Sequence, residues 1–165
     1  MPDREVFASL YQRFAPVVFR RAQRLLGTEA EAQEVVQDVF LSLYEKPEQF
    51  AGKSSLTTFL YSVTTHACFT RLRNHRTRQR LLAEHVGYGS EPAAGELGQE
   101  KLLLLRRVVA ELPDDVASAL VYSCVDGMSH EEIARLLDCS RRHVGDLIAR
   151  ASELARLHAT ETRAC

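Results

Sequence analysis

Charged side chains that could bind nucleic acid recur at helical spacing near the C-terminal end of the sequence. Arg142, Asp146 and Arg150 stand four residues apart, and Arg141 lies at the expected start of the same helix. Residues at this spacing share one face of a helix. Guanidinium groups bind phosphates and guanine edges, and a carboxylate accepts from the amino group of cytosine. The pattern predicts a helix that contacts DNA.

Two short helices and a turn position this face. Within residues 127–151, Ser129 is expected to cap the first helix, and Glu132 stands three residues later, as in a capping box. A turn at 138–140 interrupts the apolar pattern and ends in a second N-cap, Ser140. The residues expected to pack inward are Ile133, Ala134, Leu136, Leu137, Val144, Leu147, Ile148, Ala151 and Ala155. The segment resembles a helix-turn-helix, although two amphipathic helices also complete many small bundles.

One basic block stands out in a chain whose net charge is only −1. Residues 46–86 hold seven Lys or Arg against two Asp or Glu, a net charge of +5. Most of this charge comes from Arg71, Arg73, Arg76, Arg78 and Arg80. Basic side chains neutralise phosphates and release their counterions, so the block predicts affinity for nucleic acid. The alternative is a helix end whose charges are simply solvated.

An acidic face is expected on a helix in the N-terminal half, within residues 29–46. Its inward positions are Ala32, Val35, Val36, Val39, Phe40 and Leu43. The opposite side carries Glu34, Gln37, Asp38 and Leu41. Carboxylates around an exposed leucine suit a basic partner. Taken alone, the pattern favours an ordinary solvated face over a binding surface by about two to one.

The helical patterns predict an all-α protein made of two small domains. Residues 87–99 contain four of the eight glycines, which predicts a flexible linker between domains at 1–86 and 100–165. As a flexible coil, such a linker would average roughly 20 Å end to end and could reach about 45 Å. The two domains are therefore expected to move independently.

Composition narrows the classes of protein to which this chain could belong. No apolar run approaches the roughly 18 residues needed to cross a bilayer, and the first residues do not resemble a signal peptide, so a cytoplasmic protein without membrane insertion is expected. The four cysteines form no C-x-x-C pair. His66 with Cys68, and His130 with Cys139 and His143, do not provide four zinc ligands at a known spacing. No catalytic constellation is recognisable, so neither enzymatic activity nor a metal or other cofactor is expected.

Five segments carry a resemblance to a known family. LYQRFAPVVFRRAQRLLG, EAQEVVQDVFLSLYE, QFAGKSSLTTFLYSV and RLRNHR are similar, in order, to successive regions of domain 2 of a bacterial sigma factor of the extracytoplasmic-function type. LPDDVASALVYSCVDGMSHEEIARLLDCS is similar to domain 4 of the same family. Each motif is short, but their order around a linker is specific.

The resemblance implies a transcription initiation factor with core RNA polymerase and promoter DNA as partners, and an anti-sigma factor as a further candidate. It implies that Glu34, Gln37, Asp38 and Leu41 clasp a coiled coil of the polymerase. The loop at 50–55 would take up a flipped-out base of the −10 element, and the helix at 56–76 would lie along the DNA. An unstacked base needs a shaped pocket and nearby cations. Phe59 and Tyr61 offer stacking surface, although core packing is the better expectation for Phe59.

Two sets of DNA contacts are therefore expected. For the −10 region they are Lys53, Ser54, Ser55, Tyr61, Thr65, His66, Arg71, Arg73 and Arg76. For the −35 region they are Ser140, Arg141, Arg142, His143, Gly145, Asp146 and Arg150.

The sequence departs from the family pattern at both DNA-binding sites. Thr57, Ser62, Thr65 and His66 stand where basic residues or Asn are usual, so the terminal arginines should contribute more of the grip on DNA. Gly145 and Leu147 stand where Lys and Arg are common. A sigma-like protein that binds polymerase or a regulator without reading DNA is the alternative. A stand-alone helix-turn-helix repressor would leave the acidic face unexplained.

Overall fold

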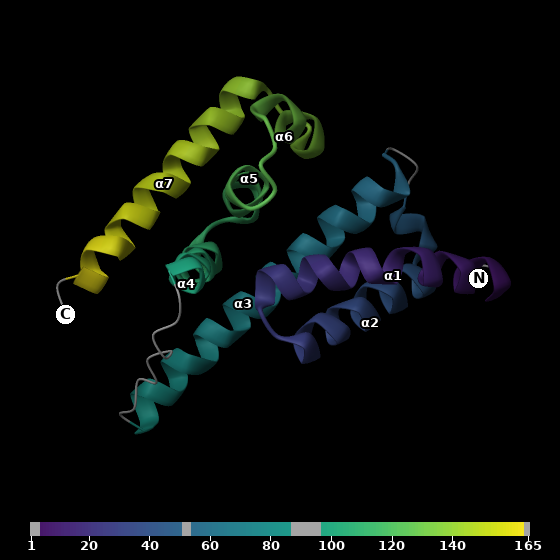
Figure 1. Ribbon diagram of the computed structural model, residues 1–165, viewed down its shortest axis with the longest axis horizontal. Helices are drawn as coiled ribbons and strands as arrows, with labels where there is room; N and C mark the ends of the chain where they lie inside the picture. The colour runs from purple at the N-terminus through teal and green to yellow at the C-terminus, as the bar shows by residue number, and fades with distance from the viewer. Residues whose placement is uncertain (1–3, 51–53, 87–96, 164–165) are drawn as a thin grey trace. The chain divides into compact units, whose positions relative to one another are not determined.

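The computed structural model describes residues 4–50, 54–86 and 97–163, and all regular structure in these ranges is helical (Figure 1). The all-α prediction is therefore confirmed. Contacts divide the chain into two compact units, Met1–Cys68 and Phe69–Cys165. The division falls within one long helix, so the later turns of that helix belong to the second unit.

Seven α-helices and one 3-10 turn occupy the described ranges. In chain order they are α1 (Arg4–Leu26), α2 (Glu29–Glu45), the 3-10 turn η1 (Pro47–Gln49), α3 (Leu56–Val86), α4 (Leu97–Glu111), α5 (Asp114–Cys124), α6 (His130–Leu137) and α7 (Arg141–Arg163). The helices predicted within residues 29–46 and at 56–76 are present, and α3 continues beyond Arg76. Of the predicted linker, residues 87–96 lie outside the described residues, whereas 97–99 are the first turn of α4.

A tight turn joins α1 to α2 and fixes where α2 begins. Gly27 has a φ of 90°, a conformation that favours glycine, and it ends α1. Thr28 is the N-cap of α2, and its hydroxyl oxygen accepts from the backbone N–H of Glu31 at 3.4 Å. The glycine turn and the threonine cap together define the first residue of α2.

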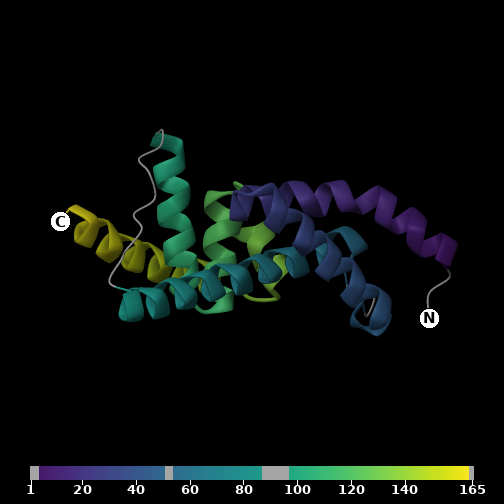
Figure 2. The same ribbon diagram turned by 90° about the horizontal axis from the view of Figure 1, so that it is seen from below.

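The helices α1 and α2 lie side by side in both views (Figures 1 and 2). All six inward positions predicted on α2 are buried: Ala32, Val35, Val36, Val39, Phe40 and Leu43. Aromatic rings join the two helices. Phe7 and Tyr11 of α1 meet Phe40 edge to face, with ring centroids 6.3 and 4.8 Å away, and Phe7 also meets Tyr44 at 5.0 Å. The outer face of α2 is thus held in place by its packed inner face.

The second unit has its own core beneath the predicted DNA-binding helix. Tyr122 of α5, Ile133 of α6, and Val144 and Leu147 of α7 are each at most 2% exposed. The helices α5 and α6 both pack against α7. The reading face of α7 is therefore attached to a packed support.

Candidate nucleic-acid interface and partner-binding surface

The capping box predicted at the start of α6 is present. The backbone N–H of Ser129 donates to a carboxylate oxygen of Glu132 at 2.8 Å, and the Glu132 N–H donates to the Ser129 hydroxyl oxygen at 3.3 Å. The Ser129 N–H, and then the Ser129 hydroxyl, stabilise the ionised carboxylate and lower the pKa of Glu132. The two reciprocal bonds define the first residue of the helix.

The turn between α6 and α7 sets the position of the reading helix. Asp138 adopts a left-handed conformation with a φ of 51°, and the N–H of Cys139 donates to the carbonyl of Ala134 at 3.0 Å. Ser140 then caps α7, because its hydroxyl oxygen accepts from the N–H of His143 at 3.1 Å. Both caps and the turn lie where the sequence predicted them.

The first turns of α7 present the predicted −35 residues to solvent. Its inner side buries Val144, Leu147 and Ala151. The exposed residues are Ser140, Arg141, Arg142, His143, Asp146 and Arg150. Gly145 is half-buried, and a β-carbon built there would meet no heavy atom within 4 Å. All seven predicted residues therefore lie at the N-cap or within the first ten residues of α7.

Asp146 lies between two arginines of α7 without pairing to either. Among the described side chains, no ion pair links it to Arg142 or Arg150, although the i, i+4 spacing would allow one. Its carboxylate therefore remains directed to solvent on the same face as the guanidinium groups. Such an anion can repel phosphate or accept from a base.

The acidic surface consists of Glu34, Gln37, Asp38 and Leu41, and all four side chains are exposed. Leu41 retains 56% of its possible exposure, a large value for an apolar residue. The structure therefore places the four predicted residues together on the outer face of α2.

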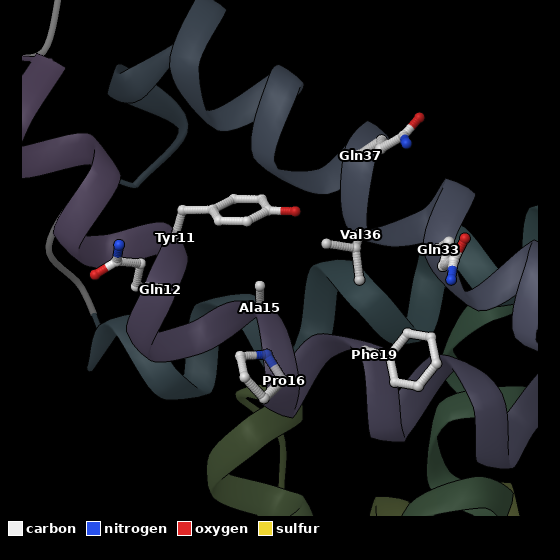
Figure 3. Close-up of a pocket in the computed structure, with 8 residues that line it drawn as sticks. All are labelled: Tyr11, Gln12, Ala15, Pro16, Phe19, Gln33, Val36 and Gln37. Atoms are coloured by element: carbon white, nitrogen blue, oxygen red, sulfur yellow. The ribbon is translucent and has the colours of Figure 1, made fainter.

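A shallow groove between α1 and α2 adjoins the acidic surface (Figure 3). Its volume is about 500 Å³, and it shares Gln37 with the acidic surface. The aromatic rings of Tyr11 and Phe19 lie at either end, with Val36 between them (Figure 3). Pro16 has no N–H to donate to the carbonyl of the residue four positions earlier in the helix. Apolar carbon beside amide groups suits the side chain of a docked helix, a feature that the sequence analysis missed.

The prediction that Thr65 belongs to the −10 surface is wrong, because Thr65 is buried. Its side chain has no exposed area, and its hydroxyl oxygen accepts from Nε of Arg21 at 2.8 Å and donates to the carbonyl of Tyr61 at 2.7 Å. The Arg21 guanidinium also lies 3.5 Å from the centroid of the half-buried Tyr61 ring. The buried Arg21 needs an acceptor, and Thr65 provides it. A side chain with no accessible surface cannot contact DNA, so we exclude Thr65 from the site.

Apart from the half-buried Tyr61, the other predicted −10 residues fall into three groups. Ser54, Ser55 and His66 are exposed, although the Ser55 hydroxyl already accepts from the N–H of Thr58 at 3.1 Å and so caps α3. Lys53 lies outside the described residues. The predicted arginines Arg71, Arg73 and Arg76 lie on α3 beyond the unit division.

Two of these arginines contact acidic residues of the second unit. Arg73 lies 2.6 Å from a carboxylate oxygen of Asp114, and Arg76 lies 2.8 Å from one of Glu111. The sequence analysis missed both pairs, because neither the separation along the chain nor a helical pattern points to them.

The described residues contain no group of three or more His, Cys, Asp or Glu placed to hold a metal ion. None of the helices within those ranges is long and apolar enough to cross a membrane.

Comparisons with known proteins agree with this architecture. Residues 10–78 match Sigma-70 region 2, and residues 102–153 match Sigma-70, region 4. The extracytoplasmic-function (ECF) RNA polymerase sigma factor SigW of Bacillus subtilis is 25% identical, with 93% of this chain and 89% of that protein covered. The ECF sigma-E factor of Escherichia coli K12 is 28% identical, with 92% and 85% covered.

Two solved structures share the fold. The sigma factor RpoE from Bartonella quintana, in complex with the anti-sigma factor NepR, has a TM-score of 0.52 at 20% identity, with 92% of this chain and 95% of that one covered. CnrH in complex with the cytosolic domain of CnrY has a TM-score of 0.51 at 19% identity, with 96% and 90% covered. The two family matches cover most of the chain, and this protein belongs to the sigma-70 family as an ECF-type sigma factor.

Proposed function

We propose that this sigma factor binds core RNA polymerase through Glu34, Gln37, Asp38 and Leu41. Support comes from their shared exposure on the outer face of α2, whose opposite face is packed. Two carboxylates attract a basic partner, and the exposed leucine offers apolar area at the centre of the contact. The adjoining groove extends this surface towards α1.

For the −10 element, the proposed contacts are Ser54, Ser55, Tyr61, His66, Arg71, Arg73 and Arg76, together with Lys53. The described members of this set all belong to α3 or to the residues immediately before it. The arginines would neutralise phosphates of the melted strand, and the accessible part of the Tyr61 ring would stack on a base. This surface would hold the strand open without a chemical step by the protein.

For the −35 element, the proposed contacts are Ser140, Arg141, Arg142, His143, Gly145, Asp146 and Arg150. The observation that carries this assignment is the position of all seven at the N-cap or in the first ten residues of α7, above a buried support. The N-terminal residues of a recognition helix are those that reach base edges in the major groove.

The protein would act in the cytoplasm, where polymerase and promoters are, and would have no enzymatic activity or cofactor of its own. Both solved structures of similar fold are complexes with a second protein, and the partner in the first is named an anti-sigma factor. An anti-sigma factor is therefore the candidate regulator of this chain.

Run-off transcription with purified core polymerase on genomic fragments tests the proposal. Core polymerase with this protein should produce discrete transcripts, and core polymerase alone should not. If the protein binds core polymerase but yields no promoter-specific transcript, the alternative of an interaction protein that does not read DNA is correct.

A further inference from the structure

A buried arginine of α1 lies against Tyr61, the aromatic residue of the proposed −10 surface. Arg21 is only 8% exposed, although arginine side chains are rarely buried. Its Cζ atom lies 3.5 Å from the centroid of the Tyr61 ring, which is van der Waals contact. Its Nε donates to the hydroxyl oxygen of Thr65 at 2.8 Å. Arg21 therefore holds α3 through a stacked ring and a hydrogen bond, all within the first unit.

Thr65 lies one turn after Tyr61 and links these two contacts. Its hydroxyl donates to the carbonyl oxygen of Tyr61 at 2.7 Å, so its lone pairs are left to accept from Arg21. The hydrogen bond to Nε orients the planar guanidinium group over the ring. The cation and the ring are thus fixed relative to each other from inside the unit.

One face of the Tyr61 ring is closed to any ligand. The guanidinium group covers that face at contact distance. The cavity that Arg21 and Tyr61 share with Phe14 has a volume of about 10 Å³, enough for one water molecule at most. A nucleic-acid base cannot enter there. Because Tyr61 is only half-buried, its accessible area lies on the rest of the ring.

We propose that Arg21 is a positioning residue for base stacking. From the inner face it holds the Tyr61 ring in the orientation in which the accessible part stacks on an unpaired base of the −10 strand. The inference rests on the proposed −10 role of Tyr61. A ring that is already immobilised loses less conformational freedom when a base stacks on it. A cation–π contact is strongest where water is excluded, as it is around the buried Arg21.

Abasic sites placed one at a time in a −10 single strand test this role. The strand would come from a promoter identified by run-off transcription, and holoenzyme binding would be measured by fluorescence anisotropy. Loss of the base that stacks on Tyr61 should weaken wild-type binding by about 5- to 150-fold. Arg21→Met keeps a long side chain but removes the charge and the donor. It should reduce this penalty by roughly two- to tenfold, at that position only.

Arg20→Met is the matched control, because Arg20 is the exposed neighbour on α1 and the net charge changes equally. It should leave the penalty unchanged at every position. An equal reduction in both variants would overturn the proposal, since the lost charge alone would explain it. If Arg21→Met weakens binding without changing the penalty at any position, Arg21 only supports the fold, and the proposal is wrong.

Thr65 provides a second test that leaves Arg21 in place and decides the question if Arg21→Met does not fold. Thr65→Val removes the acceptor of the Arg21 Nε with little change of shape, whereas Thr65→Ser keeps the hydroxyl. Only Thr65→Val should reduce the penalty at the Tyr61 position. Circular dichroism would verify that both variants keep their helical content. Equal penalties in the two variants would contradict the positioning role.

Tyr61→Ala separates this inference from the proposed function. It should remove the penalty at one position of the strand. A profile identical to that of the wild type would overturn the −10 role of Tyr61, and the positioning role with it. If Tyr61→Ala removes the penalty at one position and Arg21→Met does not reduce it there, only the positioning role is overturned.

Discussion

Thr65 of α3 and Asp38 of α2 were both predicted to be site residues, but only Asp38 exposes its side chain. Thr65 instead accepts a hydrogen bond from the buried Arg21. Polarity alone does not distinguish these roles, because a buried charge requires polar partners just as a ligand does.

Asp38→Lys should weaken binding to core polymerase by about tenfold or more, since a lysine at the centre of the proposed surface repels a basic partner. The fold should persist, because exposed ion pairs contribute only about 0–1 kcal/mol to folding. A pull-down titration would measure the affinity, with the exposed Glu48→Lys as control. If the two variants bind equally well, the acidic surface is not the polymerase contact.

Asp146→Ala should raise the affinity of the holoenzyme for non-specific DNA and reduce its preference at one base pair of the −35 element. The loss of discrimination should be about 1–3 kcal/mol if the carboxylate reads a base. Titration against a randomised −35 library would reveal it. As a control, Glu153→Ala removes the same charge two turns further along α7 and should leave the base preference unchanged. If Asp146→Ala also leaves the base preference unaltered, Asp146 is only a surface charge.

At the scale of the element, the capping box of α6 supports the reading helix. Its two reciprocal bonds fix the start of α6, and the turn at Asp138 then fixes the start of α7. Loss of the first cap should therefore reduce stability without touching the DNA-binding residues.

Ser129→Ala should lower the free energy of unfolding by about 1 kcal/mol, the usual cost of losing an N-cap. Urea unfolding followed by circular dichroism would measure it. Ser9 is exposed on α1, and its hydroxyl donates only to the backbone carbonyl of Glu5 one turn earlier. Ser9→Ala should therefore leave the free energy of unfolding nearly unchanged. Equal losses of unfolding free energy in the two variants would show that the Ser129 cap does not stabilise the fold.

The capping box should also give a pH dependence. The pKa of Glu132 is lowered by its bonds from Ser129, so its contribution to stability is fully present above the ordinary value of 4.5. It should disappear as the pH falls through the lowered pKa, because the unfolded state then binds the proton more readily. Glu132→Gln should remove this part of the pH dependence, as measured by urea unfolding over a series of acidic pH values.

At the scale of the whole molecule, the distribution of charge matters more than the net value of −1. The block at 46–86 is basic, whereas Glu111 and Asp114, which hold two of its arginines, come later in the chain. DNA binding by the holoenzyme should therefore depend strongly on this block.

Replacement of Arg71, Arg73 and Arg76 by Ala should lower promoter affinity of the holoenzyme and flatten its dependence on salt. Each lost phosphate contact should reduce the slope by up to about 0.9 logarithmic units. Titrations over a range of salt would measure it, with Arg13, Arg20 and Arg24, exposed on α1, replaced as a matched triple control. An unchanged slope would mean that the α3 arginines do not contact phosphate.

Much of the fold and part of the candidate site could be predicted from the sequence. The six buried positions of α2, the caps at Thr28, Ser129 and Ser140, and the exposed face of α7 all follow from interactions among residues a few positions apart. Helical periodicity and capping are local, so the sequence alone specifies them.

Other features depended on the tertiary structure. The burial of Thr65 depends on Arg21, which is 44 positions earlier, and the hydrogen bond from Arg73 reaches Leu112, 39 positions later. The groove between α1 and α2 likewise requires two packed helices. No local pattern encodes which distant groups meet, because that depends on how whole helices pack. The sequence by itself therefore determined which helix faces are polar and which are apolar, and the tertiary structure decided which of the polar side chains are accessible.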